Sequence, residues 1–294
     1  KAGANKNATF SKDSDNYYRF EMTGNIEASA NVVTLINGSY LTDAIPCDGC
    51  FCNLFSNCES LTTVPKLAAA SLTNYCYYGM FTSCTGLTTI PADMLPATTM
   101  ASYCYANMFS GCTGITSVPE NFLPATTLAE GCYENMFSGA GLESISATLL
   151  PITSLAGADY CYAGMFTSCT SITSIPANML PAMTLSKGCY SNMFSGCTNL
   201  TNTANLPANT LAESCYQEMF KGCTGLTSTA TLSATTMQKS CYKGMFSGCT
   251  ALTTVPTTLL PADTLSEGCY SGMFTSCTSL NTVPELSATD LKTD

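Results

Sequence analysis

The sequence Cys-Tyr-Ala-Asn-Met-Phe-Ser-Gly-Cys occupies residues 104–112, and it decides the fold because its pattern recurs along the chain. Each copy has a cysteine, an aromatic residue, two variable residues, Met-Phe, two variable residues and a second cysteine, with a single substitution in two copies. The nine leading cysteines, which lie 26–29 residues apart, are Cys50, Cys76, Cys104, Cys132, Cys161, Cys189, Cys215, Cys241 and Cys269. A period of this length indicates a solenoid, in which each repeat forms one coil and stacks on the previous one.

The repeat at residues 76–103 predicts a short helix and a short strand in each coil. In the segment 76–84 the apolar residues have the offsets 0, 1, 4, 5 and 8, which fall on one stripe of a helix of about two turns. A glycine precedes the second cysteine in several copies, as at Gly111, where it would end such a helix. The segment 87–91, Leu-Thr-Thr-Ile-Pro, predicts a strand that pairs in parallel with its equivalents in neighbouring coils. Residues 94–100 form an extended return to the next helix.

Aligned copies place like residues in columns, which we expect to stack inside one elongated core. The phenylalanine column is Phe55, Phe81, Phe109, Phe137, Phe166, Phe194, Phe220, Phe246 and Phe274. The methionine column, which begins with Leu54, is Met80, Met108, Met136, Met165, Met193, Met219, Met245 and Met273. The strand anchors are Leu61, Leu87, Ile115, Leu142, Ile172, Leu200, Leu226, Leu252 and Leu280. We interpret the methionines as adaptable core residues and not as a soft-metal site.

Seventeen of the 19 cysteines also fall in two columns. The second column is Cys58, Cys84, Cys112, Cys169, Cys197, Cys223, Cys249 and Cys277, with Ala140 in the remaining coil. Because alanine substitutes there, and because stacked residues hold their Cβ bonds parallel, we expect buried thiols. Cys47 and Cys52 lie outside the columns, on either side of Cys50. A metal or redox site, incidental thiols and a local disulfide all fit this spacing, and a Cys47–Cys52 disulfide is the specific prediction.

Composition excludes several classes of function. The net charge is −10 and the pI is near 4.3, which disfavours nucleic acid or an anionic membrane surface as a partner. No apolar run reaches the roughly 20 residues of a membrane helix, so we expect no membrane insertion. The chain contains no histidine, the commonest general base and metal ligand. We therefore expect no enzyme, no cofactor and no catalytic or metal-binding residues.

The N-terminal part of the chain lacks the repeat and predicts a β-rich cap over the end of the solenoid. Residues 17–22 and 32–36 are interpreted as strands, with Asn37-Gly38 as a tight turn. The polar opening residues 1–7 look like a processed or trimmed start. We divide the chain into residues 1–46, the tail and cap, and residues 47–294, the solenoid, which together form one continuous domain.

The repeat resembles the BspA-type leucine-rich repeat. The resemblance is carried by Phe-x-x-Cys-x-x-Leu-x-x-Ile-Pro, as at residues 81–91, and by Leu-Pro-Ala-Thr-Thr-Leu followed by Cys-Tyr-x-x-Met-Phe, as at residues 123–137. The resemblance covers residues 47 to about 286. The second motif is similar to the repeat subtype that is common in surface proteins of Bacteroides-like bacteria. The strand-ending proline is replaced by Ser146, Ala204 and Ala230 in three coils. The resemblance implies a leucine-rich-repeat solenoid, α/β in class, exported to the bacterial cell surface. It also implies adhesion to, or binding of, a protein or glycan.

Two surfaces are candidates for binding. Ligands of leucine-rich-repeat solenoids usually meet the sheet face, which here would carry pairs such as Thr88-Thr89, a uniform hydroxyl surface without the aromatic and arginine anchors of tight interfaces. The other candidate is the helix side, where the exposed pairs Glu130 with Glu134, Lys239 with Lys243, and Tyr75 with Tyr78 vary between coils.

The sequence favours a non-catalytic surface module that binds a host extracellular-matrix protein or a glycan. The alternative is a passive structural spacer that displays another domain. The sequence does not define the ligand or the oligomeric state.

Overall fold

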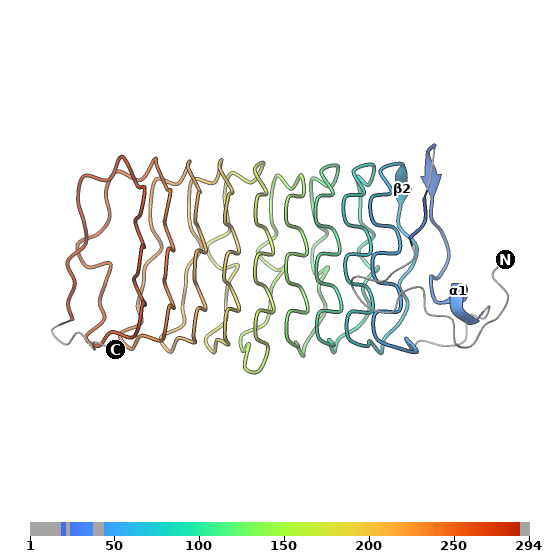
Figure 1. Cartoon of the computed structure of the whole chain (residues 1–294), viewed down its shortest axis with the longest axis horizontal. Helices are drawn as coiled ribbons and strands as arrows, with labels where there is room; N and C mark the ends of the chain where they lie inside the picture. The colour runs from blue at the N-terminus through green and yellow to red at the C-terminus, as the bar shows by residue number, and fades with distance from the viewer. Residues whose placement is uncertain (1–18, 22–23, 38–43, 289–294) are drawn as a thin grey trace.

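The computed structural model describes residues 19–21, 24–37 and 44–288. Its coils stack in one row along the long axis, from β1 and β2 at one end to the last described coil at the other (Figure 1). The helices and strands are few and short: β1 (Ile26–Glu27), α1 (Thr34–Asn37) and β2 (Leu61–Thr63). The chain is therefore a solenoid with regular ladders, but turns build most of it in place of helices and strands.

The predicted phenylalanine column is a continuous stack in the core. Adjacent rings from Phe55 to Phe274 have centroids 5.5–6.0 Å apart and planes within 4–10° of parallel. A second stack runs from Phe51 through the tyrosines that follow the leading cysteines to Tyr270, at 5.6–6.0 Å and 4–13°. The methionine and anchor columns are buried beside these rings, except for the partly buried Leu280 at the end of the anchor column. Each coil thus buries its apolar side chains against equivalent side chains of the next coil.

The prediction of helices between the paired cysteines is wrong, because these segments are chains of turns. Residues with a positive φ recur at every fourth position, as at Tyr75 (56°), Gly79 (58°) and Ser83 (58°). A left-handed residue at this interval prevents a right-handed helix. Gly111 (72°) is one of these positions and not a helix stop. The buried offsets 0, 1, 4, 5 and 8 fit both structures, because a four-residue repeat of paired turns is close to the 3.6 residues of a helical turn.

Alternate residues of each turn segment donate their backbone N–H groups in two directions. Tyr78 and Met80 donate to the carbonyls three residues earlier, of Tyr75 and Tyr77, at 3.1 and 3.2 Å. Tyr77 itself donates to the carbonyl of Cys104 in the next coil, at 3.0 Å. The left-handed residues turn the chain so that both sets of bonds form, and the buried polar backbone is satisfied without a helix or a strand.

The prediction of a parallel strand in every coil holds for β2 alone among the described residues. β2 pairs in parallel with β1, with Ile26 opposite Leu61. In a later coil the Thr201 N–H donates to the Thr173 carbonyl at 3.0 Å, and the Thr201 hydroxyl donates to the same carbonyl at 2.9 Å. The threonine hydroxyl thus shares a carbonyl with the N–H bond between the coils, and no regular ladder forms there. Parallel bridges occur instead in the return segments, as between residues 184 and 210.

The prediction of a strand over residues 32–36 is wrong, because the chain turns into α1 there. The Asn31 side-chain oxygen accepts a hydrogen bond from the Val33 N–H at 3.1 Å, and the Thr34 hydroxyl donates to the Asn31 carbonyl at 2.7 Å. Val32 and Val33 are both buried, whereas successive residues of a strand point to opposite faces. Residues 19–21 of the predicted strand 17–22 form no strand, while its residues 17, 18 and 22, together with Gly38 of the predicted turn, lie outside the described residues. The division into a cap and a solenoid stays a prediction.

All 19 cysteines are free thiols, so the prediction of a Cys47–Cys52 disulfide is wrong. The second cysteine column has a role that the sequence did not reveal. Each of its thiols donates to the carbonyl of a phenylalanine nearer the N-terminus, at 2.9–3.2 Å. The Phe55 carbonyl, for example, accepts both the Cys58 N–H (3.1 Å) and the Cys84 thiol (2.9 Å). The thiols therefore satisfy the second lone pair of these buried carbonyls.

We expect Gly141→Ala to lower the free energy of unfolding by about 2 kcal/mol. A Cβ at residue 141 would overlap the backbone carbonyl of Thr113 in the preceding coil, and backbone cannot move aside cheaply. The matched control is Gly225→Ala, whose Cβ would lie 2.8 Å from the Thr198 oxygen and should cost less. Urea unfolding of both variants measures the difference. Equal midpoints for the two would contradict the close approach at Gly141.

Candidate functional site

The outward side of the turn segments carries the side chains that differ most from coil to coil. We call this surface the turn face and define it by the outward-directed residues of segments 75–83, 103–111, 131–139, 160–168, 188–196, 214–222 and 240–248. Two positions after the leading cysteine it carries Tyr78, Glu134, Gln217 and Lys243, whereas the small residues Ala106, Ala163 and Ser191 at the same position are buried. The buried columns beneath are nearly constant, so the variation lies on top of a uniform framework.

A row of aromatic and acidic side chains crosses the N-terminal half of the turn face. Tyr75 stacks on Tyr103 with centroids 5.0 Å apart, and its ring lies 6.0 Å from that of Tyr78 at a tilt of 54°. The Tyr103 hydroxyl donates to Glu130 Oε1 at 3.1 Å. Glu134 lies near Glu130 and is half-buried. The structure therefore brings together two of the predicted exposed pairs, Tyr75 with Tyr78 and Glu130 with Glu134.

A hollow of about 480 Å³ continues this row toward the C-terminus. Its lining is mostly amide and hydroxyl, with one carboxylate and one aromatic ring: Glu134, Asn135, Tyr160, Asn192, Ser214 and Gln217. These residues come from four successive coils. Volumes of this size are typical of small-ligand sites, although the polar lining differs from that of most such pockets.

Glycines let side chains of one coil lie flat over the next. The Tyr103 ring occupies the space of a Cβ at Gly131, and the Tyr160 ring does the same at Gly188. The Asn135 side-chain oxygen likewise fills the Cβ position of Gly164. The glycines have positive φ values of 55–61° at these positions. Tyr160 and Asn135 are therefore held in place by the backbone of the following coil.

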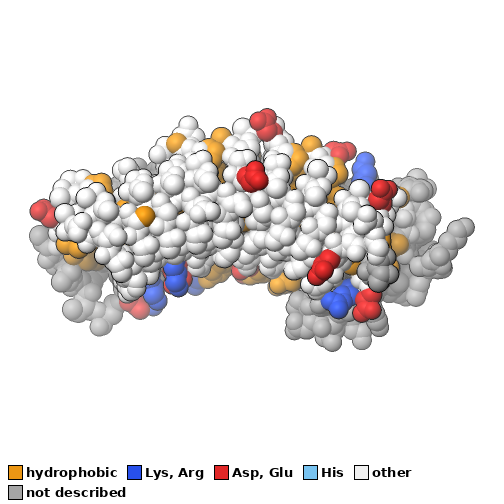
Figure 2. Space-filling model, turned by 90° about the horizontal axis from the view of Figure 1, so that it is seen from above, with side chains coloured by type: hydrophobic (Ala, Val, Ile, Leu, Met, Phe, Trp, Pro, Cys, Tyr) orange, Lys and Arg blue, Asp and Glu red, His pale blue; other side chains and the backbone are white. Residues whose placement is uncertain are grey.

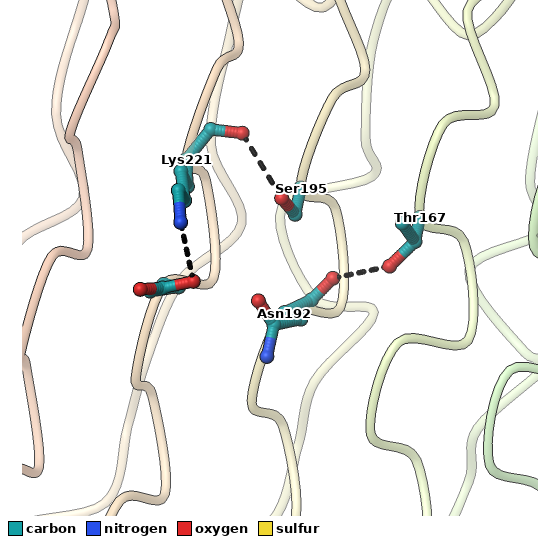
Figure 3. A network of polar contacts seen from close by, with 5 residues as sticks. Thr167, Asn192, Ser195 and Lys221 are labelled. Carbon is teal, nitrogen blue, oxygen red and sulfur yellow. Dashed lines mark hydrogen bonds and ion pairs between the residues drawn. The ribbon is translucent and has the colours of Figure 1, made fainter.

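Hydroxyl groups connect the coils beneath and beside the hollow (Figure 3). The Thr167 hydroxyl donates to the backbone carbonyl of Asn192 at 2.7 Å, and the Ser195 hydroxyl donates to the carbonyl of Lys221 at 3.2 Å. Lys221 Nζ contacts Glu218 at 2.9 Å, an exposed pair that contributes little to stability. These bonds use the backbone of residue 192 and leave its side-chain amide pointing away from them (Figure 3).

Three ionisable groups near the hollow have shifted pKa values. Burial, and then the neighbouring Glu130 carboxylate, raises the pKa of Glu134. Burial and the hydrogen bond to Glu130 raise the pKa of Tyr103. The Glu213 carboxylate, 3.1 Å from Lys187 Nζ, raises the pKa of that exposed lysine, and Tyr160 adds to this effect. The surroundings of the hollow thus favour neutral hydrogen-bonding groups, with one ion pair at the edge.

The remaining predicted surface features lie elsewhere. Lys239 forms an ion pair with Glu267 of the next coil, so the positive charge of the predicted pair Lys239 and Lys243 is partly neutralised. Thr88 and Thr89 are exposed, as expected of a hydroxyl surface. Seen from the edge at which β1 and β2 lie, the described surface is largely uncharged, with scattered acidic and basic groups (Figure 2). Among residues 19–21, 24–37 and 44–288, no three His, Cys, Asp or Glu side chains gather as metal ligands would.

Sequence reasoning missed most of the hollow, because Asn135, Tyr160, Asn192 and Gln217 read as ordinary solvated positions of a helix. A signal was nevertheless present. Three positions after the leading cysteine the column is Asn53, Gly79, Asn107, Asn135, Gly164, Asn192, Glu218, Gly244 and Gly272. Asparagine and glycine are the residues that best tolerate a left-handed backbone. Their enrichment at one position predicts turns.

Comparisons with known proteins give little further information. No family model matches the chain, and no curated protein matches it. A crystal structure of a leucine rich cell surface protein from Faecalibacterium prausnitzii A2-165 is 14% identical. The match covers 90% of this chain and 88% of that one, with a TM-score of 0.23. In the described part of the chain, no helix has the length and apolar character needed to span a membrane.

Proposed function

We propose that the chain is a non-catalytic binding module of a cell surface, which recognises a protein or a glycan through the turn face. One observation supports this most. The buried columns repeat almost without change, whereas the outward position two residues after the leading cysteine holds Tyr78, Glu134, Gln217 and Lys243 in different coils. A uniform framework with a varied outer surface is the arrangement by which repeat proteins present extended binding surfaces.

The framework suits binding because it holds these side chains in fixed positions. Adjacent coils are joined through the aromatic stacks and through backbone hydrogen bonds of 2.7–3.1 Å in the turn segments. Side chains positioned in this way lose little conformational entropy when a ligand binds. The exposed charges are few, which favours hydrogen bonding and aromatic contacts over electrostatic attraction.

A binding screen separates this function from that of a spacer. The full chain is immobilised and presented with extracellular-matrix proteins and glycans, and we expect saturable binding that free chain competes. The matched control carries Tyr78→Ala, Glu134→Ala, Gln217→Ala and Lys243→Ala, because Ala106 and Ala163 already occupy this column. The control should keep its thermal stability and bind at least ~10-fold more weakly, a loss of about 1.4 kcal/mol. No binding by the parent chain would favour the spacer, and unchanged binding by the control would exclude the turn face.

A further inference from the structure

The hollow between residues 134 and 217 presents hydrogen-bonding groups that the protein does not use itself. Within the described residues, the side-chain amides of Asn135, Asn192 and Gln217 have no hydrogen-bond partner. Each amide can donate two hydrogen bonds and accept others. The Ser214 hydroxyl lies in the same lining. A ligand with many hydroxyl groups would match these donors and acceptors.

Tyr160 gives the hollow one apolar surface. Its ring lies over the Gly188 backbone, and the next residue of that column is the small Ser214. In the part of the chain that the structure describes, no other ring stacks on Tyr160, whereas Tyr75 and Tyr103 cover one another. A tyrosine ring combines an apolar face with a polar tip. The C–H face of a sugar ring can lie against such a surface while its hydroxyl groups reach the amides.

The charges around the hollow disfavour an anionic ligand. Glu134 is part of the lining, and the nearby Lys187 is already paired with Glu213 at 3.1 Å. The whole chain carries a net charge of −10. A carboxylated, sulfated or phosphorylated ligand would meet repulsion, because none of the described residues that line the hollow is a lysine or an arginine. A neutral ligand can still donate a hydroxyl hydrogen bond to Glu134.

We infer that the hollow is a binding site for a neutral oligosaccharide, with one sugar ring against Tyr160 and its hydroxyl groups on Asn135, Asn192 and Gln217. This inference rests on the binding function proposed above and names its ligand class. The lining spans three coil-to-coil steps of 5.5–6.0 Å. This extent suits a short chain of sugars better than a single one.

Three substitutions test the site, and each introduces a residue that the chain already has at the equivalent position of another coil. Tyr160→Ser copies Ser214, Asn192→Gly copies Gly164 and Gln217→Ala copies Ala163. Serine and glycine both occur at the positive φ that residues 160 and 192 require, so the backbone should remain unstrained. The matched control is Asn107→Gly, in the same column as Asn192 but outside the hollow.

The probes are neutral oligosaccharides terminating in mannose, glucose, galactose or N-acetylglucosamine, together with sialylated and sulfated counterparts. Binding of the full chain is measured by glycan array and then by calorimetry. We expect at least one neutral probe to bind, its anionic counterpart to bind more weakly, and each variant in the hollow to lose 10-fold or more in affinity. Asn107→Gly should bind like the parent chain. Thermal melting confirms that each variant is folded.

The outcomes separate this inference from the proposed function. Glycan binding that the three variants leave unchanged would place the site elsewhere and overturn the inference, while the binding function would stand. Saturable binding to proteins without binding to any glycan would also overturn the inference and leave the binding function standing. A preference for anionic probes would contradict the argument from charge. Absence of binding to both glycans and proteins would overturn the inference and the proposed function together.

Discussion

Raising the pH above about 9 is expected to unfold the protein cooperatively. Burial raises the pKa of the Cys76, Cys132 and Cys189 thiols to about 12, from an ordinary value of 9.0. Burial raises the pKa of thirteen further cysteines, and of the tyrosines of the buried stack as well. The folded chain therefore retains protons that the unfolded chain releases between these two values.

The sign of the effect follows from this difference. Below pH 9 the thiols are protonated in both states and contribute fully to stability, whereas between about pH 9 and pH 12 only the unfolded state ionises. Each fully buried thiol then loses about 1.4 kcal/mol of its contribution for every pH unit. A dozen such groups exceed the usual stability of a domain within one unit.

Circular dichroism and thiolate absorbance, recorded together along a pH titration in the presence of a reductant, test this expectation. Both signals should change in one transition near pH 9–10, because the thiols ionise only when the core opens. Return to pH 7 should restore the folded signal. Gradual thiolate formation with unchanged circular dichroism would show that the thiols are accessible in the folded state, and it would contradict their burial.

Phe166→Ala is expected to lower the free energy of unfolding by about 3–5 kcal/mol. Phe166 is fully buried, and its ring stacks on Phe137 at 6.0 Å and on Phe194 at 5.5 Å. Its removal leaves a cavity with two exposed ring faces inside the phenylalanine column of the core. Because neighbouring coils depend on one another, we expect the loss to reach both sides of the cavity.

Phe274→Ala is the matched control, because Phe274 is partly exposed and, among the described rings, stacks on Phe246 alone, at 5.9 Å. It should cost less than half as much as Phe166→Ala. Guanidinium unfolding gives both values, and hydrogen exchange locates the coils that open. Equal costs at the two positions would mean that neither the deeper burial nor the second ring contact of Phe166 adds stability, against the coupling between coils that the solenoid requires.

The sequence was sufficient for the stacking of the coils but not for the path of the chain within each coil. Columns of phenylalanine, methionine and cysteine identify residues that lie over one another, whatever the local backbone does. The pattern of residues 76–84 could not distinguish a helix from paired turns, since both bury the same offsets. The decisive residues were those at the left-handed positions, such as Asn107 and Gly164.

The candidate site was predicted only in part, for a related reason. The pairs Tyr75 with Tyr78 and Glu130 with Glu134 lie close in the sequence and were identified directly. The hollow joins residues of four coils, and its shape depends on Tyr160 lying over Gly188 and Asn135 over Gly164. Whether two such residues meet depends on which residue lies one period later in the sequence. It also depends on a backbone conformation that directs the two residues outward.

The direction of the hydrogen bonds between turn segments has an electrostatic consequence. In every such bond the N–H belongs to the earlier coil and the carbonyl to the later one, from the Gly49 N–H on the Asn74 oxygen to the Gly248 N–H on the Thr275 oxygen. The peptide dipoles of these bonds are therefore aligned along the axis, as they are in a helix. Their sum gives the stack a polarity, with its positive pole toward the later coils. A carboxylate is stabilised at that pole and an ammonium group at the opposite one.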